Sequence, residues 1–300
     1  MRDLQRVGQD RLEVDRRVGH VADPAQTIWR WRASRGGPYL RSMAITSGKG
    51  GVGKTSLTAN LALLLCDMGV RTLVLDADAG LANIDVVLGL SPKLTLKDFI
   101  AGDSSMEDIV MEGPGGMKVV PAGSGVLELT HLDRDQRLRL NEAINGLAAR
   151  HDLLLIDTPA GVSSNVLHFN AMSEEIMVVV TPEPTSLTDA YALVKLMVTK
   201  HRRRRFSVLV NAIRSQAEGE QAFWGLNQAA ERFLGVSLVQ AGCIPWDPSV
   251  PRSVRSREPF VRMAPTARAT ESLRQVAARI MEMKPRQGSD AEVILFGPYS

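Results

Sequence analysis

The sequence predicts an α/β fold in which a mostly parallel sheet lies between two layers of helices. From Ser42 onward, short apolar runs alternate with segments whose apolar residues recur at helical spacing. The runs are apolar at consecutive positions, which is typical of strands that are covered on both faces. Strands separated by helices form parallel sheets with helices on each face, so the predicted architecture has three layers.

The predicted strands and helices follow one another along the chain. We expect strands at Met43–Thr46, Val70–Leu75, Met117–Pro121, Asp152–Ile156, Glu175–Val180, Phe206–Ile213 and Leu238–Ile244. Helical patterns occupy Thr55–Met68, Asp133–Arg150, Leu187–Lys200, Gly219–Leu234 and Thr266–Met283. In the first helix, Leu57, Leu61 and Leu64 recur at helical spacing, and Gly69 stands where the end of a helix favours glycine.

The composition is that of an ordinary globular chain, with 44% hydrophobic and 23% charged residues among 300. This balance excludes disorder throughout, and no apolar run approaches the ~20 residues that a membrane-spanning helix needs. The N-terminus is charged from Arg2 onward and lacks an apolar signal core, so the expected compartment is the cytoplasm. Cys66 and Cys243 are the only cysteines and form no CxxC pair, which excludes a thiolate metal cage and a disulfide scaffold.

Charge and composition divide the chain into three parts. Residues 1–41 hold nine arginines against five acidic residues and show no clear apolar period, so they are predicted to form a basic N-terminal arm. Residues 42–284 are the predicted folded domain, and residues 285–300 are assigned to a C-terminal tail. The net charge of the whole chain, +3, is too small to indicate nucleic-acid binding.

A phosphate-binding loop, or P-loop, is predicted between the first strand and the first helix. Residues 48–55 read G-x-x-x-x-G-K-T, and a strand before and a helix after are the context in which this motif binds nucleotide. Its glycines let backbone N–H groups converge on phosphate oxygens, and the helix N-terminus adds its positive dipole end. Lys54 is expected to reach the β- and γ-phosphates, and the Thr55 hydroxyl is expected to bind Mg²⁺. The predicted nucleotide-binding residues are Gly48, Lys49, Gly50, Gly51, Val52, Gly53, Lys54, Thr55 and Ser56.

Two of the predicted strands lead into acidic residues. Asp157 follows the apolar strand Asp152–Ile156, where an acid that holds Mg²⁺ beside a P-loop is expected. Asp76 and Asp78 follow the strand Val70–Leu75 in the same way. In an open parallel sheet, ligands bind at the carboxyl ends of the strands. We therefore expect the loop and both acidic strand ends to meet in one crevice.

These three segments together resemble the MinD/ParA family of ATPases. The loop Lys49–Thr55 is similar to the family's deviant Walker A box, which has an extra lysine early in the loop. The run Asp76–Asp85 looks like switch I of the family, and Asp157–Gly161 looks like its switch II. The resemblance runs from about Ser42 to Met283 and, over Asp76–Gly89, is strongest with the FlhG/FleN branch, which regulates flagellar number and placement. It implies an ATP-bound sandwich dimer with weak, partner-stimulated hydrolysis.

The resemblance also implies a role for each matched residue. Lys49 would reach across the dimer to the partner's nucleotide, Asp78 would hold the attacking water, and Asp157 would bind Mg²⁺ through a water. Asn211 stands where the family places an adenine-recognising asparagine, although an ordinary strand-end cap explains it as well. Pro245 stands where a backbone contact to adenine is usual. The implied catalytic residues are Lys49, Lys54 and Asp78.

Segments outside this core leave the partners open. Residues 23–31 partly match the D-Q-A-x-x-L-R element with which FlhG proteins engage the GTPase FlhF, with Pro24 in place of the glutamine. A short docking helix and an unstructured arm are both compatible with this match. Nothing after Lys284 offers the basic amphipathic helix that targets MinD and FlhG to the inner face of the cell membrane, which argues against membrane association without deciding it.

The run Lys200–Arg205 bears on the alternative functions. Its four consecutive arginines resemble a patch for DNA or anionic lipid. They also end a predicted helix, where cations interact favourably with the negative end of the helix dipole, so a solvated helix end is favoured. The favoured function is an FlhG-like, Mg²⁺-dependent ATPase switch, with a ParA-type DNA-partition ATPase or a MinD-type cell-division-site ATPase as alternatives. A metal carrier on the same core would need CxxC cysteines, and a biosynthetic amidoligase would need a substrate pocket that the sequence does not indicate.

Overall fold

The computed structural model describes residues 41–78, 84–123, 132–148 and 150–283. Within these ranges a single sheet has the strand order β3-β4-β2-β5-β1-β6-β7-β8. The strands are β1 Arg41–Ser47, β2 Thr72–Asp76, β3 Met111–Glu112, β4 Lys118–Val120, β5 Leu153–Ala160, β6 Glu175–Val180, β7 Ser207–Ile213 and β8 Val239–Pro245. Every neighbouring pair is parallel except β3 with β4. All of the predicted strands are present.

The helices lie between the strands, as the sequence predicts. Those in the described ranges are α2 Lys54–Asp67, α3 Ile84–Leu88, α4 Leu96–Ala101, α5 Met106–Ile109, α6 Arg134–Ala148, α7 Ser164–Met172, α8 Pro184–His201, α9 Gln216–Leu234, α10 Ser249–Ser256, α11 Phe260–Met263 and α12 Arg268–Glu282, with a 3₁₀ turn at Pro114–Gly116. The five predicted helices correspond to α2, α6, α8, α9 and α12. Gly69 follows the end of α2 with a φ of 85°, the left-handed conformation that favours glycine there.

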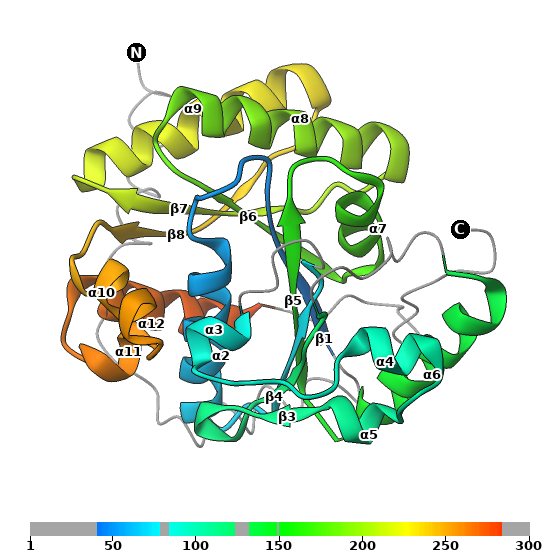
Figure 1. The fold of residues 1–300 in the computed structure, drawn as a ribbon. Helices are drawn as coiled ribbons and strands as arrows, with labels where there is room; N and C mark the ends of the chain where they lie inside the picture. Colours follow the sequence, from blue (N-terminus) through cyan, green and yellow to red (C-terminus); the bar gives the residue numbers. More distant parts are fainter. Residues whose placement is uncertain (1–40, 79–83, 124–131, 149, 284–300) are drawn as a thin grey trace, which may run out of the picture.

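Helices cover both faces of the sheet, which confirms the three-layer α/β architecture. Figure 1 shows α2 and α12 on one side of the strands and α6 and α7 on the other. In β2, Val74 belongs to the core under α2 and α12, whereas its neighbours Leu73 and Leu75 belong to the core under α4 and α6. The strands are apolar at consecutive positions because each successive side chain enters one of these two cores.

Some elements differ from the sequence-based expectation. Arg41, assigned to the arm by its charge, is the first residue of β1 and is buried. Its guanidinium donates to the Met283 carbonyl at 3.0 Å, so it satisfies a backbone group at the end of α12. The antiparallel strand β3 was not predicted because two residues carry no readable pattern. The short helix α7 was also not predicted, although the Ser163 hydroxyl caps it by accepting from the Val166 N–H.

The basic run at the end of α8 is held mainly by intramolecular contacts. The Arg203 guanidinium donates to the carbonyls of Ala171, Ser173 and Glu174 around the end of α7. Arg204 donates to the Gly235 carbonyl, and Arg205 forms a 3.5 Å ion pair with Glu175. Of the four arginines, three thus have structural partners, which agrees with the favoured interpretation of the run as a helix end.

The sequence also makes predictions about the two ends of the chain and about membrane-spanning helices. Residues 1–40 of the predicted arm, with the partial match at residues 23–31, lie outside the described residues. Residue 284 and the predicted tail at residues 285–300 lie outside them as well. Among the helices that the structure does describe, none is both long enough and apolar enough to cross a bilayer.

Candidate functional site

The P-loop connects the carboxyl end of β1 to the first turn of α2. β1 is buried along its whole length between β5 and β6, and the loop leaves it at Gly48. Gly51 and Gly53 have φ values of 79° and 89°, a left-handed backbone that glycine adopts without strain. Gly53 caps α2, so the free N–H groups of the helix's first turn face the loop. The residues predicted from the motif therefore form the backbone cradle that phosphate binding requires.

Close packing explains two further glycines in and beside the loop. A Cβ on Gly48 would lie 2.2 Å from the carbonyl carbon of Asp189 in α8, so only glycine fits between the loop and that helix. A Cβ on Gly53 would lie 2.5 Å from Nδ2 of Asn211. By contrast, a Cβ on Gly51 would meet nothing within 4 Å, and Gly50 and Gly51 are exposed. The inner side of the loop is fixed by its neighbours, while its outer side is open to a ligand.

Lys54 lies at the start of α2 and points at the acid of the neighbouring strand. Its Nζ is 3.2 Å from Oδ1 of Asp157, and both side chains are buried. The Thr58 hydroxyl, one turn further along α2, donates to the Lys54 carbonyl at 3.0 Å. The predicted meeting of the P-loop with Asp157 is thus confirmed, across 103 positions of sequence. Thr58 was not predicted, because a buried threonine within a helix carries no signal of its own.

Asp76 is the last residue of β2 and is paired in register with Asp157 of β5. Asp157 does not end its strand as predicted, because β5 continues to Ala160. Burial, with the charge of Asp157 as the second cause, raises the pKa of Asp76 to about 8. Burial also raises the pKa of Asp157, although Lys54 and the Thr55 hydroxyl oppose that shift. Asp78 follows two residues after Asp76, and its backbone N–H donates to Oδ1 of Asp76 at 3.0 Å. Two acidic strand ends and the P-loop therefore occupy one edge of the sheet, as predicted.

The polar groups left over at this edge fit a bound magnesium nucleotide. Oδ2 of Asp76, Oδ2 of Asp157 and Oγ of Ser56 are buried without a hydrogen-bond partner. Buried polar atoms of this kind are rare and call for a ligand or an ion. Mg²⁺ is commonly held by one or two carboxylates together with substrate phosphates, and a P-loop supplies the phosphate site. Thr55 and Asp157, the predicted Mg²⁺ ligands, would hold the ion, and residues 48–56 would hold the phosphates.

The second lysine of the loop, Lys49, lies apart from Lys54. Its Nζ is 2.7 Å from Oε2 of Glu183 and donates to the Thr185 hydroxyl at 2.9 Å. Both partners stand at the start of α8, and the ion pair is exposed. These partners were not predicted, because the helix was expected to begin at Leu187. Pro184 was the available signal, since proline favours the first position of a helix and Glu183 then becomes its N-cap.

Asn211 and Pro245 lie at the same edge of the sheet on neighbouring strands. Asn211 does not end its strand, because β7 continues to Ile213. Its side-chain Nδ2 donates to the Val52 carbonyl at 2.7 Å, so the amide supports the P-loop directly. Pro245 is the last residue of β8 and pairs with Ile213. The structure brings Asn211 to the loop and places Pro245 on the neighbouring strand, and an adenine contact by either remains a prediction.

The sequence of this chain is similar to a family model and to several known proteins. A family model described as an AAA domain matches residues 40–208. The antiactivator FleN of Pseudomonas aeruginosa is 43% identical over 241 residues, which cover 80% of this chain and 86% of FleN. The flagellum site-determining protein YlxH of Helicobacter pylori is 31% identical over 240 residues, which cover 80% of this chain and 81% of YlxH.

A solved structure shares the fold of this chain. The septum site-determining protein MinD of Pyrococcus horikoshii, complexed with Mg-ADP, superimposes with a TM-score of 0.63 at 29% identity, covering 80% of this chain and 96% of that one. The P-loop and both acidic strand ends lie within the residues 40–208 that the family model matches. The chain therefore belongs to the MinD/ParA family of P-loop ATPases, in its FlhG/FleN branch.

Proposed function

We propose that this protein is an ATP-driven dimerisation switch that regulates the number or placement of flagella. The observation that carries the switch is the separation of the two P-loop lysines. Lys54 pairs with Asp157 inside the site, whereas Lys49 lies on Glu183 and Thr185 at the exposed start of α8. A lysine held outside its own site by an exposed ion pair is available to a second subunit, because such pairs contribute only ~0–1 kcal/mol.

Each residue of the site has a task in this proposal. Lys54 exchanges Asp157 for the β- and γ-phosphates, and the loop N–H groups hold the remaining phosphate oxygens. Asp78 accepts a hydrogen bond from the attacking water and aligns it with the γ-phosphorus. Lys49 crosses to the partner's nucleotide and offsets the charge on its γ-phosphate, as an arginine finger does.

Magnesium dependence follows from the two predicted metal ligands. Mg²⁺, when bound, would neutralise charge on the β- and γ-phosphate oxygens. The Thr55 hydroxyl and the Asp157 carboxylate would hold it, and the unpartnered Oδ2 of Asp157 supports this assignment. Asp76 would orient switch I through the hydrogen bond that its Oδ1 accepts from the Asp78 N–H.

The flagellar role rests on the relatives. FleN is an antiactivator by name and YlxH determines the flagellum site, and both cover four fifths of this chain. The experiment is expression in Pseudomonas aeruginosa that lacks FleN. We expect the native chain to restore the normal number of flagella and Lys54→Ala to fail. No restoration by a folded, expressed native chain would contradict the flagellar role and favour a MinD-type or ParA-type role.

A partner GTPase of the FlhF kind is proposed to dock on residues 23–31. The arm differs in charge from the rest of the chain, and no residue of the described site belongs to it. Deleting residues 1–38 should therefore leave ATP affinity unchanged and weaken stimulation of the GTPase. Loss of ATP binding by the truncated chain would show that the arm supports the core instead.

A further inference from the structure

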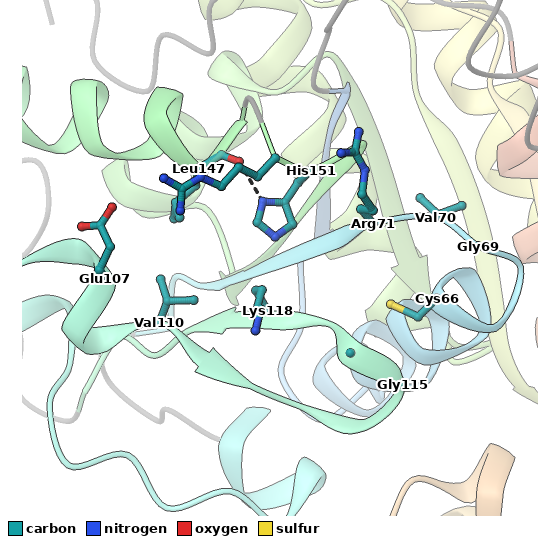
Figure 2. Close-up of a pocket in the computed structure, with 12 residues that line it drawn as sticks. Cys66, Gly69, Val70, Arg71, Glu107, Val110, Gly115, Lys118, Leu147 and His151 are labelled. Carbon is teal, nitrogen blue, oxygen red and sulfur yellow. Dashed lines mark hydrogen bonds between the residues drawn. The ribbon is translucent and has the colours of Figure 1, made fainter.

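A second site candidate lies at the opposite edge of the sheet from the P-loop. A cavity of about 530 Å³ opens where β2 and β4 begin and where α2 and α6 end. Its volume is within the range of pockets that hold small organic ligands. Cys66, Val70 and Arg71 line it from the junction of α2 and β2, and Leu147 and His151 line it from the end of α6. Figure 2 shows these side chains around the cavity.

The walls of the cavity combine an apolar surface with cations. Cys66 and Val110, both half-buried, supply the accessible apolar part, and Val70 and Leu147 are almost fully buried. The charged and titratable side chains that line it are Arg71, Lys118, Arg150, His151 and Glu107. Three of these are cations at neutral pH and one is an acid, so the lining favours an anion. An apolar wall beside several convergent polar groups is the usual composition of a small-molecule site.

The cations differ in how far their charge is already used. Arg71 is bound by the buried Asp152 through bonds of 2.8 and 3.1 Å, and Lys118 pairs with Glu112 at 2.7 Å. Each of these retains donors or exposed surface, but its charge is shared. Arg150 is exposed, and no side-chain partner is recorded for it in the described part of the chain. Arg150 is therefore the cation with most to gain from an anionic ligand.

His151 is oriented so that one ring nitrogen remains for a ligand. Its Nδ1 lies 2.7 Å from the Leu147 carbonyl oxygen, which can only accept, so Nδ1 carries the proton of that bond. Nε2 is the other nitrogen, and Figure 2 shows it turned toward Lys118. Burial and the nearby cations Arg71 and Lys118 lower the pKa of His151, although Asp152 and the Leu147 carbonyl oppose them. Nε2 of the neutral ring is therefore a hydrogen-bond acceptor, and an anion bound there requires a proton on Nε2, which the charge of the anion favours.

We propose that this cavity binds a small anionic compound in which a phosphate or carboxylate group is joined to an apolar body. The anionic group would lie against Arg150, with the Nε2–H of His151, protonated when the anion binds, as a second donor. The apolar body would cover Cys66 and Val110. Glu107 opposes the anion and limits the affinity. This site is separate from the nucleotide site, and the proposal does not depend on the function given above.

The test follows the imidazole signals of His151 by NMR in the full-length chain. Excess Mg-ADP keeps phosphate compounds away from the P-loop, and His151→Gln assigns the signals. The probes are phenyl phosphate and benzoate. Inorganic phosphate and phenol, the two fragments of phenyl phosphate, are tested separately. We expect saturable shifts of His151 with phenyl phosphate or benzoate, and the tighter of the two identifies the anionic group. Each fragment alone should bind about tenfold more weakly or worse.

Two variants with opposite expected effects sharpen the test. Arg150→Gln should weaken the tighter probe by about tenfold, because a charged hydrogen bond is lost. Glu107→Gln should strengthen it severalfold, because the opposing charge is removed. The exposed Arg252→Gln in α10 is the matched control and should change nothing. The proposal is overturned if His151 shows no saturation by roughly 10 mM of either compound, or if Arg150→Gln and Arg252→Gln bind equally.

Discussion

Asp76, the last residue of β2, is the register partner of Asp157 in β5, so two buried carboxylates lie side by side in the nucleotide site. Lys54 offsets the charge of Asp157, while the pKa of Asp76 rises to about 8. One oxygen of each carboxylate is buried without a hydrogen-bond partner. The site therefore reduces the stability of the chain at neutral and alkaline pH, in exchange for groups that a magnesium nucleotide can use.

The first prediction is that Asp76→Asn stabilises the chain and flattens its pH dependence. The folded chain keeps the Asp76 proton up to about pH 8, whereas an unfolded chain loses it near pH ~4. Because the folded state binds more protons between these values, the free energy of unfolding falls as pH rises through them. The asparagine carries no charge and should be more stable by ~5 kcal/mol at about pH 8.5, but only by ~1 kcal/mol at about pH 5.

Urea denaturation without nucleotide or Mg²⁺ at both pH values measures this difference. Asp103→Asn, at an exposed position, is the control and should leave stability unchanged at both. If Asp76→Asn and the native chain show the same pH dependence, Asp76 is not the group that retains the proton.

A second prediction concerns the basic run after α8. Arg203→Ala should lower the free energy of unfolding by ~2 kcal/mol, because it leaves the carbonyls of Ala171, Ser173 and Glu174 without their donor. Arg202→Ala, at an exposed neighbour, should be neutral within ~0.5 kcal/mol. Urea denaturation of both variants decides the question. Equal stabilities would mean that the run is a free surface, and a DNA or lipid patch would regain support.

A third prediction separates two roles of Asn211. Asn211→Ala removes the donor to the Val52 carbonyl, so thermal denaturation should show a loss of ~1 kcal/mol. If Asn211 also recognises adenine, the preference for ATP over GTP should fall in calorimetric titrations. We expect both effects. An unchanged ATP/GTP ratio with reduced stability would restrict Asn211 to supporting the loop.

Strands and motifs could be predicted from the sequence where a short run of consecutive residues determines the structure. Most strands could be predicted because they are buried on both faces, as β1, β2 and β6 are along their whole length. The P-loop could be predicted because its glycines and Lys54 form a contiguous motif. The strand order β3-β4-β2-β5-β1-β6-β7-β8 could not be predicted, because it depends on which connections between strands pack best. The rule that ligands bind at the carboxyl ends of parallel strands predicted that Asp157 lies beside the P-loop. Nothing local indicated the contact of Lys49 with Glu183, 134 positions away.

A fourth prediction concerns hydrolysis. Asp78→Ala should bind ATP and dimerise like the native chain while losing about 10²–10⁴-fold in turnover, the usual contribution of a group that positions a reacting water. Asp78 is half-buried at the start of switch I, so its removal leaves no buried cavity. Phosphate release under saturating Mg-ATP measures the rate. Turnover at the native level would show that another residue holds the water.

The central claim is that Lys49 acts on the partner's nucleotide. Its pair with Glu183 is exposed, so replacing it should leave folding and ADP binding intact. Lys49→Ala should therefore bind ADP as a monomer and fail to dimerise with ATP. Lys49→Arg should fail too, because a planar fork does not replace a compact ammonium in a tight site. Lys93→Ala, at an exposed lysine outside the loop, is the matched control.

The most direct measurement is light scattering with Mg-ATP in the Asp78→Ala background, where slow hydrolysis preserves any dimer. The account predicts a dimer for Asp78→Ala alone and for Asp78→Ala with Lys93→Ala. It predicts a monomer for Asp78→Ala with Lys49→Ala, although that chain still binds ATP. A dimer of the Lys49→Ala, Asp78→Ala protein at the same ATP concentration would contradict the action of Lys49 across the interface.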